Sequence, residues 1–443
     1  MTDHSGTSRP LSVPAGRLTR MGRMGSLAAG VAGRMAVESV RHWGRGDRPL
    51  ARDLLLMPAN MRRIADELAR LRGAAMKVGQ LVSMDTGDVL PPELADIMAR
   101  LRADADFMPP SQLRDVLDAE WGSGWRARFA RFDVRPIAAA SIGQVHRATL
   151  PDGTELAIKV QYPGIARSID SDVANIGRLI RVSGLLPDGF DLGPYLGEAR
   201  AQLHEEADYH AEAAHLERFG ALLARDDRFV LPLLHGPMTT LRVLAMEFVA
   251  SEPIEVLADA AQTERDRMVQ ALCDLMLREV FQFGVMQTDP NFANYRYDRE
   301  SGRIVLLDFG ATRAIPAVLA KQMLRFVRAG LSNDRVAVDA VVAEMGLLPD
   351  VVTGAFRARI LDMIMMVFDA VLAAPVLDLG TSDLGRRLQR EGEALARDGF
   401  VPPPVPMDLL YVQRKVAGMF LLARRLRARV PVADMVSAYA EGA

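Results

Sequence analysis

The chain has 443 residues, 49% of them hydrophobic and 25% charged, so it can bury a large core and should divide into two or three lobes or domains. A formal net charge of −2 provides no general basis for nucleic-acid binding, and we expect no nucleic-acid partner. The single Cys273 excludes an internal disulfide framework and a cysteine zinc site, which fits a cytosolic compartment.

The first 48 residues are read as a basic extension rich in Gly and Arg. Arginines between Arg17 and Arg45 flank a small-residue stretch at 25–33. Such a segment can lie on an anionic membrane surface, form a flexible leader or pack as a helix on the body. Its glycines permit close helix contact in a homodimer and equally suit a loose leader. No stretch reaches the about 20 apolar residues of a spanning helix, and no secretory signal is evident.

The next two segments differ in pattern. Residues 49–132 have helical periodicity and contain Lys77-Val78-Gly79-Gln80, and Ser111 is expected to cap a helix. Residues 133–250 then predict a strand at 145–150, a tight turn and a strand at 154–160. One long helix is expected at about 192–223. Strands are expected at 229–234 and 243–249.

Residues 251–345 are predicted to be mainly helical up to Phe283. A polar loop at 287–294 and two short strands, at 295–297 and 304–307, lead into Asp308-Phe309-Gly310. Residues 346–443 form a helical extension, broken near Gly380 and at 402–404. The pattern predicts an α+β chain with a small β-containing lobe, a helical lobe and helical extensions at both ends.

Lysine is rare, with four lysines against fifty arginines. Lys159 follows Leu156-Ala157-Ile158 in a predicted strand, and Lys77 lies in the 49–132 region; the others are Lys321 and Lys415. A lysine kept against this bias indicates a site that needs a compact ammonium and not a planar guanidinium.

Phosphoryl chemistry on ATP needs a cation on the phosphates, an acid that holds this cation, metal ligands and a catalytic carboxylate. The chain offers these residue types in one order: Lys159, Glu212, Asp289, Asn294 and Asp308. Four residues separate Asp289 from Asn294, as in a kinase catalytic loop. We expect Lys159 to bind phosphate, Glu212 to pair with it and Asp289 to orient the nucleophile. Asn294 and Asp308 are expected to hold Mg²⁺.

The predicted acidic helix carries more carboxylates than one lysine needs. At about 100° per residue, Glu206 and Glu212 point about 120° apart, so both cannot comfortably reach one lysine. Asp208 and Glu212 share a face. This geometry suggests two acidic functions, with Glu206 available for Lys77.

Two features depart from ordinary protein kinases. In place of a Gly-rich turn the chain has Ala138-Ala139-Ala140-Ser141, and alanine takes positive φ only at a cost. A stiffer loop should change nucleotide preference and slow γ-phosphate transfer. No Ala-Pro-Glu segment follows Asp308. Together these features argue against phosphorylation of ordinary protein substrates.

The alanine-rich segment at 138–146, Lys77-Val78-Gly79-Gln80, Glu206-Ala207-Asp208 and the segment at 287–291 resemble the UbiB-type atypical kinase family of ubiquinone biosynthesis. The Gln-Thr-Asp-Pro-Asn form resembles the mitochondrial branch. The resemblance implies a protein-kinase-like two-lobe fold, with residues 133–250 as N-lobe and 251–345 as C-lobe.

Other properties follow from this resemblance only. Lys77, Gly79 and Gln80 would belong to a helical insert that gates the cleft, with Lys77 meeting Glu206 and Asp208. Ala138, Ala139, Ala140 and Ser141 would contact the nucleotide and favour ADP over ATP. The family implies slow Mg²⁺-dependent ATP hydrolysis, stimulated by anionic membrane lipid and phenolic quinone precursors, and support of the pathway enzymes.

Two functions are therefore weighed. The first is an atypical kinase or ATPase, peripherally associated with the inner membrane from the cytoplasm. The second is a nucleotide-gated binding module that remodels its hold on lipid or partner proteins with negligible turnover. It would need Asp308 for nucleotide binding but not Asp289.

Overall fold

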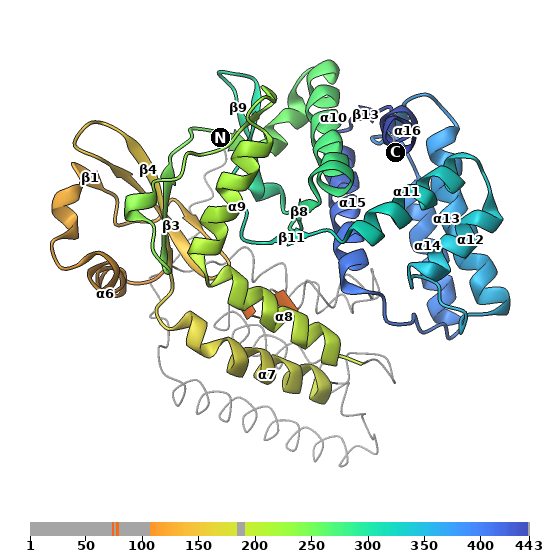
Figure 1. The fold of residues 1–443 in the computed structure, drawn as a ribbon, viewed down its shortest axis with the longest axis horizontal. Helices are drawn as coiled ribbons and strands as arrows, with labels where there is room; N and C mark the ends of the chain where they lie inside the picture. Colours follow the sequence, from red (N-terminus) through yellow and green to blue (C-terminus); the bar gives the residue numbers. More distant parts are fainter. Residues whose placement is uncertain (1–72, 75–76, 79–106, 184–190, 442–443) are drawn as a thin grey trace, which may run out of the picture. The chain divides into compact units, whose positions relative to one another are not determined.

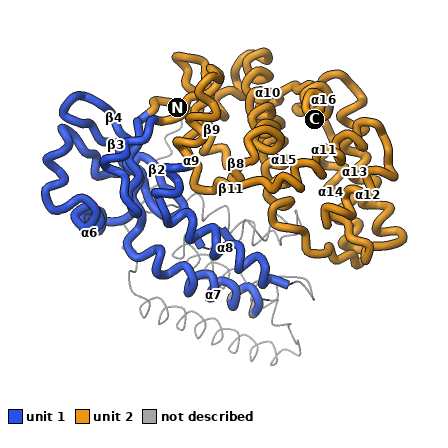
Figure 2. Tube along the Cα trace, in the orientation of Figure 1, with its two compact units in different colours: residues 1–214, 233–248 blue, residues 215–232, 249–443 orange. Residues whose placement is uncertain are grey.

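The computed structural model describes residues 73–74, 77–78, 107–183 and 191–441, and the chain forms two compact units (Figures 1 and 2). Unit 1 contains residues up to Ala214 and the segment Leu233–Phe248. Unit 2 contains His215–Pro232 and Val249–Ala443. The basic extension lies outside the described residues, as do residues 49–72, 75–76 and 79–106 of the region expected to be helical at 49–132.

Unit 1 is built on a five-stranded antiparallel sheet of order β1-β3-β4-β6, with β2 paired to the same strand as β1, namely β3. The predicted hairpin is present as β3 and β4, and its turn contains Gly153 at a φ of +91°. Residues on both faces of β4 are buried, so a charged residue in it needs a partner. The strands are β1 Arg131–Phe132, β2 Ala138–Ala139, β3 Gly143–Thr149, β4 Glu155–Gln161 and β6 Val243–Glu247.

In the described part of residues 107–206, unit 1 also contains three α-helices. α7 and α8 lie side by side (Figure 1). α6 begins at Pro110 with proline in its first turn, so Ser111 lies inside the helix and the expected serine cap is wrong. Proline supplies a suitable φ and lacks only an N–H that has no partner at a helix start. The helices are α6 Pro110–Trp121, α7 Ile165–Ser183 and α8 Gly193–Glu206, with short 3₁₀ turns η2 Trp125–Arg128 and η3 Gly236–Met238.

The helix expected at about 192–223 is two helices. α8 ends at Glu206, and α9 spans Tyr209–Leu222, within which the boundary of the two units falls. The Asp208 carboxylate accepts hydrogen bonds from the backbone N–H groups of His210 and Ala211, at 3.0 and 3.3 Å. An aspartate in this position stabilises a helix start, which explains the break.

Unit 2 contains three small sheets. β5 pairs in parallel with β10, which continues through β9 to β7. β8 pairs with β11, and β12 with β13. The strand expected at 229–234 is only the short β5. The strands are β5 Phe229–Val230, β7 Glu252–Pro253, β8 Val285–Gln287, β9 Tyr295–Asp298, β10 Arg303–Leu306, β11 Thr312–Ala314, β12 Leu377–Asp378 and β13 Arg429–Val430.

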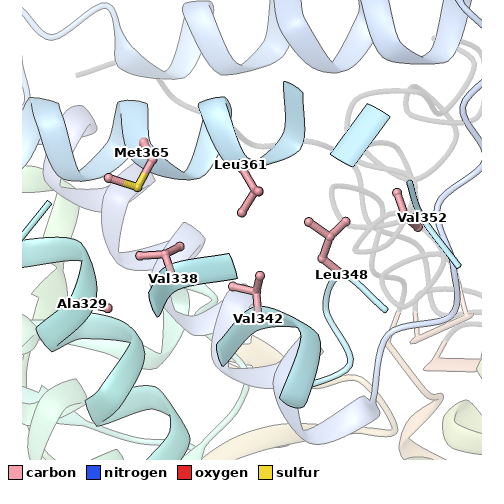
Figure 3. Packing of buried hydrophobic residues seen from close by; sticks show 7 residues of the cluster. All are labelled: Ala329, Val338, Val342, Leu348, Val352, Leu361 and Met365. Carbon is pink, nitrogen blue, oxygen red and sulfur yellow. The ribbon is translucent and has the colours of Figure 1, made fainter. Parts of the chain in front are cut away.

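The rest of unit 2 is helical. A core of Ala329, Val338, Val342, Leu348, Val352, Leu361 and Met365 holds α11, α12 and α13 together (Figure 3). α10 passes directly into a π-helical turn, η5 Glu279–Phe283, just before β8. The helices are η4 Ile254–Asp259, α10 Gln262–Arg278, η6 Phe292–Asn294, α11 Ala317–Leu331, α12 Arg335–Glu344, α13 Gly354–Leu372, α14 Leu384–Arg397, α15 Met407–Arg425 and α16 Val432–Glu441.

Within the described ranges, no helix combines the length and the apolar character that crossing a bilayer requires.

Candidate functional site

In unit 1, the candidate phosphate-binding lysine is held by the expected glutamate. Lys159 Nζ in β4 lies 2.8 and 2.9 Å from the two carboxylate oxygens of Glu212 in α9. The residues are only 7% and 3% exposed, so each charge depends on the other. The ring of Tyr209 lies 5.2 Å from the same ammonium, which is a favourable cation–π distance. The ammonium therefore has one defined position.

A second buried ion pair connects the 73–78 segment to the alanine-rich loop. Lys77 pairs with Glu206, as expected, and the Ser141 hydroxyl donates to Oε2 of Glu206 at 2.6 Å. A Cβ atom on Gly73 would lie 2.6 Å from the Ser141 carbonyl oxygen, so this segment lies directly against the loop. Gly79 and Gln80 lie outside the described residues. Asp208, expected beside Lys77, is placed at the start of α9.

The alanine-rich loop adopts a conformation that suits alanine. Ala138 and Ala139 form β2, and Ala140 N–H donates to the Gly143 carbonyl at 2.9 Å, which closes a tight turn. None of the three alanines has positive φ. A side chain cannot be accommodated at Gly143, because a Cβ atom there would lie 2.4 Å from the Val160 carbonyl oxygen. The loop is thus a short, exposed strand tethered through Ser141.

In unit 2, the candidate catalytic loop brings Asp289 and Asn294 together. Asn294 Nδ2 donates to the Asp289 carbonyl at 3.0 Å and to its Oδ2 at 3.3 Å. The 3₁₀ turn η6 produces this return of the chain, and the Asn291 side chain caps it by accepting from Ala293 N–H. Arg414 of α15 reaches the other carboxylate oxygen of Asp289, with Nη2 2.7 Å from Oδ1.

The Asp308-Phe309-Gly310 turn is fixed next to this loop. Gly310 N–H donates to Asp308 Oδ1 at 3.0 Å, and Leu307 N–H donates to the Asn294 carbonyl at 3.3 Å. Phe309 is buried and packs on Phe219, with ring centroids 4.9 Å apart. These contacts connect the segments that carry the two candidate metal ligands.

Asn294 and Asp308 offer side-chain oxygen atoms, which are the type of ligand that suits Mg²⁺. Mg²⁺ prefers oxygen ligands and takes few from the protein when phosphate is present. The amide nitrogen of Asn294 is used toward Asp289, so the amide oxygen is the atom suited to a cation. Asp308 supplies a carboxylate.

Sequence motifs gave no role to Arg414, Lys415 or Glu279. Lys415 Nζ lies 3.0 Å from Glu279 Oε2, and both residues are almost fully buried. Burial alone would lower the pKa of Lys415, but the Glu279 carboxylate outweighs it and the pKa is raised, so the ammonium stays charged. The rarity of lysine is the one signal in the sequence that points to Lys415.

A small antiparallel sheet that carries a Lys–Glu ion pair, with a separate Asp–Asn loop and an Asp-Phe-Gly turn, defines a protein-kinase-like protein. A model described as the ABC1 atypical kinase-like domain matches residues 100–342. The chain belongs to this family. The motif-based resemblance to UbiB-type atypical kinases is thereby confirmed.

Curated relatives agree with this assignment. The chain is 37% identical to "Atypical kinase COQ8B, mitochondrial" of Rattus norvegicus over 97% of this chain and 82% of the relative. It is 33% identical to "Atypical kinase COQ8, mitochondrial" of Saccharomyces cerevisiae, over 97% and 86%. A solved structure of Rv3197 with erythromycin, from Mycobacterium tuberculosis, has a TM-score of 0.60 at 25% identity, covering 86% of this chain and 95% of that one.

Proposed function

We propose that this protein is a Mg²⁺- and nucleotide-dependent atypical kinase, acting as an ATPase or small-molecule kinase in ubiquinone biosynthesis. The buried Lys159–Glu212 ion pair carries the proposal, because two buried charges in one fixed geometry suit a lysine that must meet phosphate oxygens. Membership of the ABC1 family and likeness to COQ8 proteins support the pathway assignment.

Each candidate residue has a role in this proposal. Lys159 binds phosphate and Glu212 positions it, while Asn294 and Asp308 hold Mg²⁺, which neutralises charge on the phosphates. Asp289 orients the nucleophile, either water or a phenol hydroxyl. The exposed β2 strand with Ser141 covers the nucleotide, and the Lys77–Glu206 pair, with Gly79, Gln80 and Asp208, gates access.

The proposed setting is the cytoplasmic face of the inner membrane, with peripheral attachment to anionic lipid. The proposed partners are ubiquinone precursors or enzymes of that pathway, and a homodimer is compatible with the Gly-rich extension. Proteins in trans are not the proposed acceptors, since no Ala-Pro-Glu segment follows Asp308.

One observation favours the second function, a nucleotide-gated module without significant turnover. The Asp289 carboxylate is engaged by Arg414 on one oxygen and Asn294 on the other. A carboxylate used in this way can serve to hold the loop and not to accept a proton.

Phosphate release from MgATP separates the two functions. The protein is assayed with and without anionic liposomes and a ubiquinone-head-group phenol, beside Asp308→Asn and Asp289→Asn variants. Stimulated release that both substitutions abolish supports the enzyme. Absence of release, with nucleotide binding lost only in Asp308→Asn, supports the module. Full release by Asp289→Asn contradicts the role given to Asp289.

A further inference from the structure

Three of the four lysines are buried, and each lies beside a glutamate. Two of these pairs belong to motifs that the sequence already singles out. The third has no assigned role. The pairs are Lys77–Glu206, Lys159–Glu212 and Lys415–Glu279. Arginine is the usual basic residue of this chain, yet position 415 is a lysine, as positions 77 and 159 are.

The Lys415–Glu279 pair holds both backbone groups of Gln287. Glu279 Oε1 accepts from the Gln287 N–H at 3.2 Å, and Lys415 Nζ donates to the Gln287 carbonyl at 2.9 Å. One residue of the chain is therefore fixed by a carboxylate on one side and an ammonium on the other. Charge-assisted hydrogen bonds of this kind are stronger and more directional than neutral ones.

Gln287 passes this constraint to Asp289. Its side-chain Nε2 donates to the Asp289 carbonyl at 2.9 Å. Thr288, between them, is tied to the Ala311 carbonyl through both its N–H and its hydroxyl, each at 2.8 Å. The backbone that leads to Asp289 is thus held at three consecutive residues.

Helix α15 lies close enough to the 287–290 loop for its side chains to hold the backbone there. A Cβ atom on Gly418 would lie 2.3 Å from Cβ of Pro290, so the helix backbone lies against the loop. Arg414, Lys415 and Gly418 share one face of the helix, because residues three and four apart lie together. This face lies outside residues 100–342, the part that the family model matches.

Fold stability alone does not account for an ionic pair here. Replacing a buried ion pair by apolar residues of similar volume is often neutral or stabilising. What apolar residues cannot supply is one donor and one acceptor for the same backbone residue, Gln287.

We propose that Lys415 and Glu279 are positioning residues for Asp289, acting through Gln287, and that α15 thereby sets the geometry of the catalytic loop. The inference rests on the proposed function, in which Asp289 orients the nucleophile.

The test uses the full chain in four forms: wild type, Lys415→Met, Lys415→Met with Glu279→Met, and Lys321→Met as control. Lys321 is an exposed lysine of α11. Each form is measured for kcat and KM of MgATP-dependent phosphate release, for thermal midpoint, and for hydrogen–deuterium exchange over residues 285–294.

The single Lys415→Met variant should lose stability, since it leaves a buried carboxylate without its cation. The double variant should regain that stability, yet its kcat should stay at least about tenfold below wild type with KM nearly unchanged, as expected for misplacement of a catalytic group. Its 285–294 amides should exchange faster than those of wild type. Lys321→Met should match wild type.

Two results would overturn the inference. One is a double variant that regains wild-type kcat together with stability, which would make the pair purely structural. The other is wild-type exchange over 285–294 in the double variant. If wild type itself releases no phosphate, the proposed enzymatic function has failed, and the exchange measurement alone decides whether the pair positions the loop.

Discussion

Nη2 of Arg414 lies 2.7 Å from Oδ1 of Asp289, so the carboxylate proposed as catalytic is bound by a residue 125 positions further along the chain. The two side chains are only 12% and 21% exposed, so solvent screens the contact less than it would on the surface. Asp289 is thus held by its own loop and by the C-terminal helical extension.

Arg414→Met and Asp289→Asn should therefore fail to act independently. Each single substitution should lower phosphate release at least about tenfold, because each breaks the ion pair that fixes Oδ1 of Asp289. The double variant should be no slower than the worse single variant. Nucleotide affinity, measured beside release, should change little. If the double variant instead loses phosphate release by the product of the two single losses, Arg414 and Asp289 act independently and their contact has no role in the reaction.

Gly143→Ala should destabilise unit 1. The added Cβ would lie 2.4 Å from the Val160 carbonyl, so the backbone of two strands must shift, at about 1–3 kcal/mol. Gly197→Ala in α8 is the matched control, because nothing lies within 4 Å of its Cβ position and alanine favours helix. Urea unfolding measures both. An equal change of stability in the two variants would contradict the close approach.

Ser141→Ala should loosen the alanine-rich loop. It removes the 2.6 Å hydrogen bond to Glu206 and leaves the Lys77–Glu206 pair in place. Hydrogen exchange over residues 138–142 should rise several-fold. Ser301→Ala, which removes an exposed hydroxyl in unit 2, is the control and should leave this segment unchanged. Unchanged exchange in Ser141→Ala would show that the hydroxyl does not tether the loop.

Stability should fall in mild acid because of His146. Its Nδ1 faces the Asp133 carbonyl and its Nε2 faces the Gln144 amide nitrogen, so the neutral ring with Nδ1–H satisfies both. Gln144 is held in this orientation because its Oε1 accepts from Met108 N–H. Burial lowers the pKa of His146 from 6.5 to about 4.

As pH falls, His146 therefore becomes protonated in the unfolded chain before it does so in the folded protein. The stabilisation is fully present above pH 6.5 and is lost as the pH falls toward about 4, a total of about 3 kcal/mol. Urea unfolding, followed by tryptophan fluorescence, should show a steeper loss of stability in this pH window for wild type than for His146→Gln. Parallel curves would mean that His146 does not carry the effect.

Local patterns predicted the parts of the site that are close in sequence. The β3–β4 hairpin follows from alternation around a Gly-containing turn, and the Asp289–Asn294 contact follows from their spacing. The Lys159–Glu212 pair required one further argument, that a buried ammonium needs a carboxylate. That argument also holds for Lys415, but no motif named its partner, Glu279.

The errors have local physical causes. The break between α8 and α9 depends on Asp208 as a cap, and an aspartate inside a helical pattern can equally be a solvated helix residue. Proline at the start of α6 took precedence over Ser111. The contact of Arg414 with Asp289 has a different cause: the two residues are 125 positions apart, and local spacing does not encode the path of the chain between them.

The lysine pairings have a consequence for surface chemistry. Lys77, Lys159 and Lys415 are 4%, 7% and 2% exposed, whereas Lys321 is exposed on α11. All four lysines of the chain lie in the part that the structure describes. Among the four lysines, Lys321 is therefore the accessible target for amine-reactive dyes and cross-linkers on the folded protein. Labelling at any other lysine reports that a buried ion pair has opened.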